Sequence, residues 1–393
     1  MLFFIKKEIC VRGVHMTKFE KKQAQINPLT SEKFDLNVEI FQKRLADWFE
    51  KNRRDLPWRR FRTPYTVWVS EIMLQQTQVR SVAEYFTRFV AKFPNIESLA
   101  QAPLQDVLKV WEGLGYYSRA RNLHRAAKMV LERFGGQLPD SKEAILQLPG
   151  IGPYTAGAIL SLAFGVPEPV LDGNVIRVLS RVFLFEEPVD SSKGKATLWQ
   201  LAEELLPSEA PGRHNEALME LGATVCTPRE PECAVCPVRD FCGAFSTERQ
   251  AELPVRNPRK KTPHYHVAAG VIWKDGEILI TLRPTDKMLG GLWEFPGGKC
   301  LSGETLETCL QREIREELNL TVRVGRHFMD VKHAYSHFKI TLHMFHCEFL
   351  GGRPKLNGVD DFRWVQPKQL RELPFPAADV RVIRKILNDN SPE

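Results

Sequence analysis

The period of the hydrophobic pattern changes once along this sequence, and that change limits the fold more than any other feature. From Val38 onward, apolar residues recur at every third or fourth position, which is the spacing of amphipathic helices. Breaks such as Phe134-Gly135-Gly136 separate the segments. The expected helices span residues 104–112, 119–134, 141–147, 154–164, 174–184, 194–206 and 214–222. Because no strong strand signal precedes the cysteines near residue 226, the first half is predicted to be an all-α domain.

From residue 265 onward the pattern is typical of strands. Two apolar runs flank an Asp275-Gly276 turn, and a later segment alternates apolar and polar residues. Strands are expected at 267–272, 278–282 and 338–344, and helices at 304–318 and 379–388. The second half is therefore predicted to be a mixed α/β domain.

Prolines alternate with basic residues between the two halves, as in Pro258-Arg259-Lys260-Lys261. Such a segment is stiff and positively charged, and it suits either contact with phosphates or a solvated spacer. The chain is thus predicted to be multidomain. Its parts are a flexible N-terminal tail at 1–34, an all-α domain at 35–245, a basic Pro-rich linker at 246–264 and an α/β domain at 265–393.

The composition agrees with two globular domains. The chain has 393 residues, 43% of them hydrophobic, which is enough for two cores. Its net charge of +7 fits a polyanionic partner, although a generic basic surface would look the same. No apolar run is long enough to cross a membrane, and the N-terminus lacks the apolar region and cleavage site of a signal peptide. We expect a reducing, cytoplasmic setting and no membrane partner.

Four of the 8 cysteines crowd into one short stretch with the spacing C-x6-C-x2-C-x5-C. Cysteines this close together, without a secretory signal, indicate a metal site rather than disulfides. The four are Cys226, Cys233, Cys236 and Cys242. Four thiolates suit either zinc or an iron–sulfur cluster, and the spacing alone leaves both open.

The string Leu148-Pro149-Gly150-Ile151-Gly152 lies between two predicted helices. Its glycines allow a tight turn that exposes backbone N–H groups beside a helix N-terminus. Such a hairpin binds a DNA phosphate without reading the base sequence. An ordinary turn between helices is the alternative.

Two carboxylates, Glu71 and Asp172, stand on either side of this hairpin in the sequence. Judged singly, Glu71 would be a surface carboxylate on a helix, and Asp172 a helix N-cap. Together with a DNA-binding hairpin, the pair suggests chemistry on a nucleotide within DNA.

Longer strings at 68–79, 113–123 and 171–178, combined with the hairpin and the cysteine spacing, resemble the adenine DNA glycosylases of the MutY family. That family belongs to the helix-hairpin-helix superfamily of endonuclease III. The resemblance covers about residues 35–245. It implies that the loop 226–242 binds a [4Fe–4S] cluster, and that the partner is double-stranded DNA.

The resemblance also implies catalytic roles. Glu71 would protonate the leaving adenine, and Asp172 would stabilise the positive charge that develops on the sugar. Tyr154 stands where bifunctional relatives carry a lysine nucleophile, so a monofunctional enzyme that leaves an abasic site is implied. Tyr154 and Asn174 would assist at the sugar. A packing tyrosine is the alternative for Tyr154.

The remaining implied roles concern the DNA. The target base must leave the helical stack, and Gln76 and Tyr116 match the positions that wedge into the duplex. Thr77 next to Gln76, and Gly150 and Gly152 in the hairpin, are grouped with them as DNA-binding residues. For Tyr116, a core aromatic is the alternative.

In the second half, Gly298 opens a nearly complete Nudix box, in which Asn319 replaces the last glycine. Glu313, Glu316 and Glu317 fall at i, i+3 and i+4, so one helix face could hold Mg²⁺ against a pyrophosphate. A solvated acidic face is the alternative. Because the MutY family carries a MutT-like domain that reads 8-oxoguanine, we expect a Nudix-like recognition domain without hydrolysis.

The string Tyr335-Ser336-His337 resembles the Phe-Ser-His loop with which this family contacts the oxidised guanine. Tyrosine in place of phenylalanine keeps the stacking surface. Ser336 and His337 offer polar contacts that would distinguish the oxidised base from guanine. A hairpin turn with incidental polar residues is the alternative.

The function expected from the resemblance is base excision repair of adenine mispaired with 8-oxoguanine or guanine. A monomer in a bacterial cytoplasm, bound to the nucleoid through DNA, is expected. A thymine or uracil mismatch glycosylase is one alternative. A Nudix pyrophosphatase tethered to DNA by a non-catalytic helical domain is another, and a DNA-lesion binder without chemistry is a third.

Overall fold

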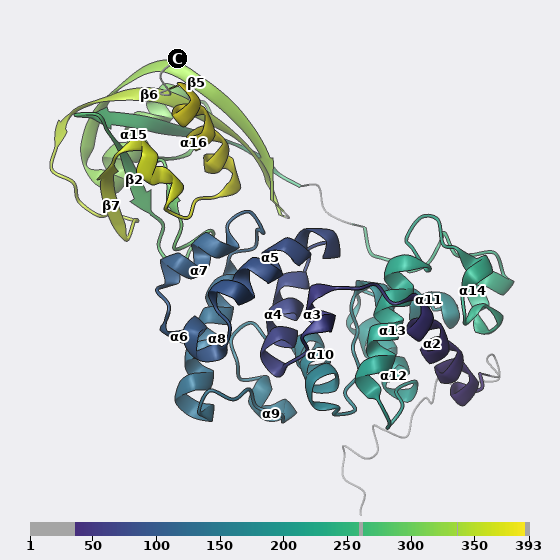
Figure 1. The fold of residues 1–393 in the computed structure, drawn as a ribbon. Helices are drawn as coiled ribbons and strands as arrows, with labels where there is room; N and C mark the ends of the chain where they lie inside the picture. Colours follow the sequence, from purple (N-terminus) through teal and green to yellow (C-terminus); the bar gives the residue numbers. More distant parts are fainter. Residues whose placement is uncertain (1–35, 259–261, 336, 390–393) are drawn as a thin grey trace, which may run out of the picture.

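The computed structural model describes residues 36–258, 262–335 and 337–389. The predicted tail at 1–34 lies outside these residues, and so do Arg259, Lys260 and Lys261 of the predicted linker. Within the described ranges the chain has a helical part followed by a part built on a sheet, as the change of period predicts (Figure 1).

The helical part has no strand among its described residues, which confirms the all-α prediction. The helices are α2 (Val38–Asn52), α3 (Pro57–Arg60), α4 (Pro64–Leu74), α5 (Val79–Lys92), α6 (Ile96–Gln101), α7 (Leu104–Trp111), α8 (Ser118–Phe134), α9 (Lys142–Ile145), α10 (Pro153–Phe164), α11 (Gly173–Val182), α12 (Ser192–Glu204), α13 (Pro211–Thr224) and α14 (Gly243–Ser246), with 3-10 turns η2 (Cys233–Val235) and η3 (Arg239–Phe241). Each helix predicted between residues 104 and 222 is present within a few residues.

Helices α4 and α10 form the centre of this part. Thr63 caps α4 by a reciprocal pair of hydrogen bonds with Thr66, and Pro64 takes the first helical position, where its missing N–H is not needed. Both helices are apolar and buried on nearly every side, so they pack against each other in the interior. Polar side chains in the second half of α4, such as Ser70 and Glu71, are therefore shielded from solvent.

The second part is a mixed sheet with one parallel pairing among its described strands, that of β1 with β6. The strand order is β3-β2-β1-β6-β5, with β4 paired to β1 and β7 paired to β2. The elements are β1 (His264–Lys274), β2 (Glu277–Leu282), β3 (Trp293–Glu294), β4 (Gly297–Lys299), α15 (Leu306–Leu318), β5 (Leu320–Ala334), β6 (Lys339–Gly352), β7 (Asp361–Val365), η4 (Pro367–Arg371) and α16 (Ala377–Asp389). The predicted strands and helices of this half are confirmed.

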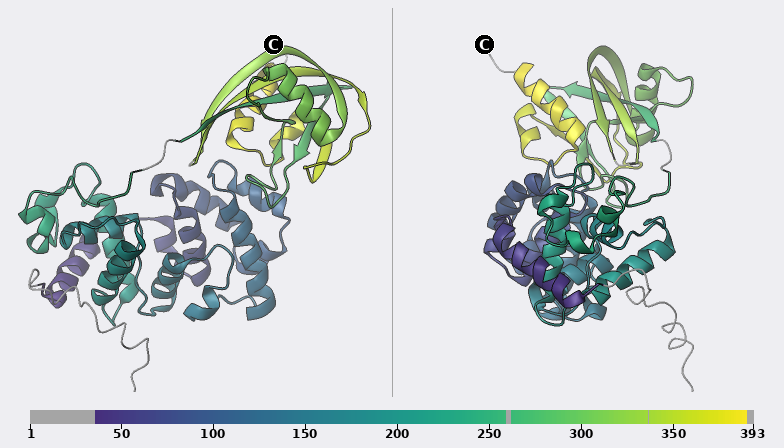
Figure 2. Two further views of the ribbon diagram at one scale, coloured as in Figure 1. Left: turned by 180° about the vertical axis from the view of Figure 1, so that it is seen from behind. Right: turned by 90° about the vertical axis from the view of Figure 1, so that its right-hand side faces the viewer.

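Alternate residues of β1 enter two separate cores. Ala268 packs with Leu310 of α15, whereas Val271 packs with Val382 of α16. Because successive side chains of a strand point to opposite faces, α15 and α16 cover opposite faces of the sheet, as Figure 2 also shows.

The sequence pattern does not predict strand β5. It lies at one end of the strand order, and its central residues are mostly exposed. Charged and polar residues therefore occupy both alternating positions, as at Arg326 and His327. A strand with little buried surface leaves no clear period in the sequence.

The two parts contact each other where the sheet part lies over α7 (Figure 1). Leu292 is fully buried in the larger helical core. The Gln105 side chain donates to the carbonyl of Gly291 (2.9 Å) and accepts from the indole N–H of Trp293 (3.1 Å). An apolar insertion supported by hydrogen bonds joins the two parts.

The beginning of the predicted linker packs on the helical part. The N–H of Val189 donates to the carbonyl of Val255 (3.0 Å), and the Asn257 side chain donates to Asp190 (2.9 Å). The described chain thus remains attached to the helices as far as residue 257.

Candidate active site

Glu71 lies near the end of α4 and is only 5% exposed. The Tyr154 hydroxyl, from the first turn of α10, donates to Glu71 Oε2 (2.8 Å). Burial raises the pKa of Glu71 from 4.5 to about 7; the Tyr154 hydrogen bond opposes this rise, and the charge of Asp172 adds to it. A carboxyl group with this pKa holds a proton near neutral pH and can also release it.

Asp172 is the N-cap of α11, as the structural alternative suggested. Its Oδ1 accepts from the backbone N–H groups of Asn174 (2.9 Å) and Val175 (2.7 Å), and its Oδ2 accepts from the Asn174 side chain (3.0 Å). Burial raises its pKa, while these hydrogen bonds oppose the rise. Asp172 can therefore cap α11 and still present its carboxylate to the site that contains Glu71.

One cavity of about 550 Å³ collects all four predicted catalytic residues and several of the predicted DNA-binding ones. Its volume is in the range of small-molecule sites. The predicted residues that line it are Glu71, Gln76, Thr77, Gly152, Tyr154, Asp172 and Asn174. Apolar side chains, including Leu56, Trp58 and Leu171, complete the lining. The cavity could hold a flat base with a carboxyl group near the base and another near its sugar.

The sequence interpretation missed a buried ion-pair network on one wall of this cavity. Arg62 donates to Glu216 (2.7 Å), and Arg59 donates to both Glu216 and Glu220 (3.1 Å each). Arg54 donates to Glu220 through two side-chain nitrogens, at 2.7 and 2.8 Å, and through its backbone N–H, at 2.9 Å. Glu216 and Glu220 lie one turn apart on α13, and that i, i+4 spacing was the available signal. It is equally typical of a solvated helix face.

The sequence interpretation also missed Arg119, although this residue lies in the string 113–123, one of those that resemble the MutY family. Its guanidinium donates to the carbonyls of Met73 (2.7 Å) and Gln75 (2.5 Å) at the end of α4, and to that of Gly115 (3.1 Å). Burial lowers its pKa to about 10. The side chain satisfies carbonyls that the end of the helix leaves unpaired and holds the turn around Tyr116 against α4.

The predicted wedge residues share an unusual backbone conformation. Gln76 (φ +56°) and Tyr116 (φ +49°) are both left-handed, which is rare for residues other than glycine and common at functional sites. Both line a second cavity together with Gly150 of the hairpin. A β-carbon on Gly150 would come within 2.8 Å of the Asn122 side chain, so glycine is required there.

Tyr116 also lines a third cavity, of about 370 Å³, between the two parts of the molecule. Tyr335 and His337, from the hairpin between β5 and β6, line its other side. The third member of the predicted loop, Ser336, lies outside the described residues. Aromatic side chains from both parts therefore border one space.

The four cysteines of the loop border a common cavity beside α11. Arg181 of α11 donates to the sulfur of Cys226 and accepts from that of Cys242 at its carbonyl, each at 3.4 Å. Burial raises the pKa of Cys236 to about 12, so a positively charged centre would be needed to hold its thiolate.

The distances between these sulfur atoms help to distinguish a zinc site from an iron–sulfur cluster. Among the described residues, the four sulfurs do not form a group whose ligand atoms all lie within 4.8 Å of one another. A tetrahedral zinc site would hold them about 3.8 Å apart. An iron–sulfur cluster has a metal core of several atoms and needs wider spacing. The four sulfurs are thus spread more widely than a zinc site requires and surround one cavity, as the ligands of a cluster would.

In the Nudix box, Arg312 binds the carboxylates. It donates to Glu304 (2.8 Å), Glu313 (2.9 Å) and Glu316 (3.0 Å). Asn319 has a left-handed backbone (φ +55°) at the end of α15, which asparagine tolerates in place of the usual glycine. The motif thus keeps its helix end, and Arg312 ties Glu304, Glu313 and Glu316 into ion pairs that only partly offset their charge.

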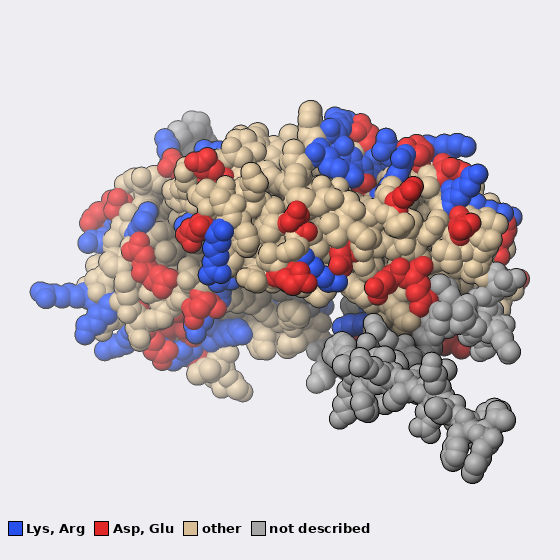
Figure 3. Space-filling model, turned by 90° about the horizontal axis from the view of Figure 1, so that it is seen from below, with Lys and Arg blue, Asp and Glu red and all other residues tan. Residues whose placement is uncertain are grey.

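Positive and negative side chains are interspersed on the face drawn in Figure 3, so the excess of basic residues is not gathered there. Among the described residues, no helix is long and apolar enough to cross a membrane.

The chain matches two family models. One, described as HhH-GPD superfamily base excision DNA repair protein, matches residues 69–204, and the other, described as NUDIX domain, matches residues 268–385. An adenine DNA glycosylase of Rattus norvegicus is 36% identical over 402 residues, which cover 88% of this chain and 78% of that protein. Its counterpart from Homo sapiens is 36% identical over 406 residues, with 88% and 74% covered.

Among solved structures, a thermostable thymine-DNA glycosylase is similar with a TM-score of 0.49 and 31% sequence identity. That similarity covers 53% of this chain and 97% of the other. The matches to the two adenine DNA glycosylases cover 88% of this chain, which includes residues of both parts of the molecule.

Proposed function

Since this chain belongs to the adenine DNA glycosylase family, we propose that it removes adenine from DNA by hydrolysing the bond between the base and its deoxyribose. The observation that carries the proposal is Glu71, a buried acid whose pKa of about 7 suits proton donation, in one cavity with Asp172. An acid at the base and a carboxylate at the sugar are what this bond cleavage needs.

In the proposed reaction, the flipped adenine enters the cavity with its ring against the apolar wall. Glu71 donates its proton to a ring nitrogen, and the bond to the sugar breaks with its electron pair going to the base. The positive charge left on the sugar lies near the Asp172 carboxylate, which stabilises it until water adds at the same carbon. The proton that this water loses goes to the solvent or back to the ionised Glu71. Tyr154 keeps the Glu71 carboxyl in position through its hydrogen bond.

The reaction is proposed to stop at the abasic site. Strand cleavage by the lyase route requires an amine that attacks the sugar. Tyr154 takes the place at which the related bifunctional enzymes carry lysine, and no lysine is among the described residues that line the cavity. The product would be an intact strand that alkali can break.

The base opposite the adenine is proposed to be 8-oxoguanine, with guanine as a weaker alternative. Support comes from the cavity between the two parts of the molecule, which Tyr116, Tyr335 and His337 all line. Two tyrosines can stack on a base, and the imidazole can hydrogen-bond its edge. Adenine is an undamaged base, so recognition of its partner would protect correct pairs from cleavage.

Cys226, Cys233, Cys236 and Cys242 are proposed to hold the [4Fe–4S] cluster, which would supply a structural centre for the loop. The side chain of Arg177 connects this loop to the start of α11, where Asp172 and Asn174 lie. It donates to the carbonyl of Cys226 (2.7 Å) and to the side chain of Asn174 (2.8 Å). Loss of the loop should therefore disturb the sugar-binding residues.

A Mg²⁺ ion at Glu313, Glu316 and Glu317 would lie beside the guanidinium of Arg312, which already binds one oxygen of Glu313 and one of Glu316 and would repel the ion. We therefore propose that the sheet part recognises a base and does not hydrolyse pyrophosphates. Phosphate release from oxidised dGTP with Mg²⁺, abolished by Glu316→Gln, would overturn this assignment.

The main test uses duplexes with adenine, thymine or uracil opposite 8-oxoguanine or guanine. Treatment with alkali should reveal breaks at adenine opposite 8-oxoguanine, and omission of alkali should reveal none. Cleavage at thymine or uracil opposite guanine instead would identify the mismatch-glycosylase alternative. Breaks without alkali would contradict the monofunctional mechanism.

The partner-base assignment has its own test. His337→Ala should reduce the preference for 8-oxoguanine over guanine roughly tenfold, as expected for one lost hydrogen bond. His346→Ala is the matched control, because that imidazole packs on Phe328 and does not line the interdomain cavity. An unchanged preference in His337→Ala would contradict the role of this loop.

A further inference from the structure

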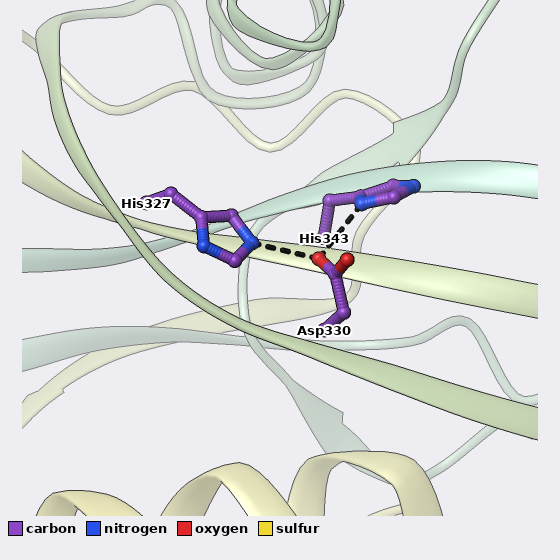
Figure 4. A group of neighbouring side chains, drawn as sticks. All are labelled: His327, Asp330 and His343. Carbon is purple, nitrogen blue, oxygen red and sulfur yellow. Dashed lines mark hydrogen bonds and ion pairs between the residues drawn. The ribbon is translucent and has the colours of Figure 1, made fainter.

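The sheet part carries a group of histidines that base removal does not use. His327 and Asp330 come from β5, and His343 comes from β6. One ligand atom from each lies within 4.8 Å of the other two. Figure 4 shows both imidazole rings directed at the Asp330 carboxylate. Oδ1 of Asp330 contacts Nε2 of His327 (2.7 Å) and Nδ1 of His343 (2.8 Å).

The strand register explains this convergence. Asp330 and His343 are direct partners in the antiparallel pairing of β5 with β6. His327 is three residues from Asp330, and a regular strand would place it on the opposite face. The register shifts between His327 and Met329, which brings its side chain to the same face.

A third histidine, His266 of β1, supports the group. Nδ1 of His266 lies 2.9 Å from Nε2 of His343, and the two rings are stacked at an interplanar angle of 12°. Metal-bound histidines usually direct their second ring nitrogen to such a partner, which fixes the orientation of the ring. His343 is thus oriented in advance, with its Nδ1 toward Asp330.

We propose that His327, Asp330 and His343 bind one divalent transition-metal ion, for which Zn²⁺ is the natural probe. Two imidazole nitrogens and one carboxylate oxygen suit Zn²⁺, Co²⁺ or Ni²⁺, whereas Mg²⁺ and Ca²⁺ prefer oxygen ligands alone. Three protein ligands leave a position open for water.

The geometry requires little movement to accept the ion. Zinc bonds of about 2.0–2.1 Å in a tetrahedral site would place ligand atoms roughly 3.3 Å apart. The three side chains must therefore separate by about half an ångström as the ion replaces the shared protons. The side chains of His327 and Asp330 are 48% and 47% exposed and can move, while His343, at 12%, stays fixed.

The ion would join the edge strand β5 to β6. These two strands lead to the hairpin that carries Tyr335 and His337. A bound ion would therefore cross-link the two strands that the hairpin connects. This consequence does not depend on which base the hairpin reads.

The test is a calorimetric titration of Zn²⁺ into the full-length protein without a histidine tag, with the visible absorbance of the cluster unchanged. One binding site is expected. Asp330→Asn and His343→Gln should each weaken it by at least about tenfold, since even outer-shell partners contribute that much. His333→Gln, on the same strand but outside the group, is the matched control and should bind as the unaltered protein does.

A second measurement guards against misfolding. Zn²⁺ should raise the unfolding temperature of the unaltered protein and of His333→Gln, but not that of Asp330→Asn. If Asp330→Asn unfolds early without metal, the exposed His327→Gln replaces it in both measurements. No Zn²⁺ binding by the unaltered protein, or equal affinity in the ligand variants, would overturn the proposal and leave an ordinary histidine–aspartate network.

Discussion

Glu71 in the helical part and Glu313 in the sheet part are both helix carboxylates that the sequence marks as chemically important. Their hydrogen-bond donors differ. A neutral hydroxyl, that of Tyr154, donates to Glu71, whereas the Arg312 guanidinium donates to Glu313. A guanidinium favours the ionised carboxylate, and burial beside another acid favours the protonated form. The donor therefore distinguishes a carboxyl group ready to give a proton from one that is tied into an ion pair.

Glu317 shows why a raised pKa alone does not identify a catalytic acid. Burial raises its pKa to about 8, and the charges of Glu294 and Glu313 add to the rise. Glu71 has a similar pKa but also borders a base-sized cavity with Asp172 opposite. The combination of cavity, neutral donor and second carboxylate is what supports catalysis.

The largest expected effect is that of Glu71→Gln. This change keeps the shape of the side chain and removes the proton, so the single-turnover rate of adenine release should fall by about 10³–10⁴-fold. Glu313→Gln is the control and should cleave at the unaltered rate. A Glu71→Gln enzyme that cleaves normally would remove the distinction between the two carboxylates.

Asp172→Asn should have the next largest effect. Asparagine caps a helix about as well as aspartate, so α11 should remain folded and the melting temperature should change little. The lost negative charge should slow base release by about 10²–10³-fold. A large fall in melting temperature with normal cleavage would mean that Asp172 is a cap and nothing more.

The sequence predicted the parts of this comparison that depend on local pattern. Helical spacing located the helix that carries Tyr154 and the helix that Asp172 caps, and the four cysteines stood out by their spacing. It did not locate α4, which carries Glu71, because that helix is apolar on nearly every side and shows no amphipathic period. The hairpin at Gly150 was readable because only a few residue types suit its backbone. Each of these features is encoded within a short window of the sequence.

Features that depend on distant partners were not predictable. Arg119 and the Arg59–Glu216 contact look like solvated charges in the sequence, because the carbonyls and carboxylates they meet come from other elements. Strand β5 has too few buried residues to show a period, so the convergence of His327 with His343 was hidden as well. Long-range contact, rather than local preference, decides these positions.

The pH dependence of cleavage should sharpen the contrast between the two carboxylates. Glu71 must be protonated to act, and its pKa is raised to about 7, so the rate should fall to half near pH 7 and drop tenfold per unit well above it. For the same reason, the stability that this proton contributes is present below pH 4.5 and lost as the pH rises through about 7.

Tyr154→Phe tests whether the pKa of Glu71 sets the pH dependence of cleavage. The Tyr154 hydrogen bond lowers the pKa of Glu71, so its loss should move the alkaline limb to higher pH. Tyr265→Phe, a substitution in the sheet part, is the control. A limb that moves to lower pH would show that another group sets the profile.

Arg312→Ala should have the smallest effect, because this change alters only the surroundings of Glu313 and the neighbouring carboxylates of the sheet part. Cleavage of adenine should be unchanged, because Arg312 lies in the sheet part and does not line the catalytic cavity. The sheet part should melt about a few degrees lower, since the ion pairs are partly exposed and contribute modestly. Mg²⁺ should then stabilise the variant more than the unaltered protein, because Glu313 and Glu316 would lack their cation. Equal stabilisation of both by Mg²⁺ would mean that Arg312 does not exclude the metal, and the difference between the two carboxylate groups would need another cause.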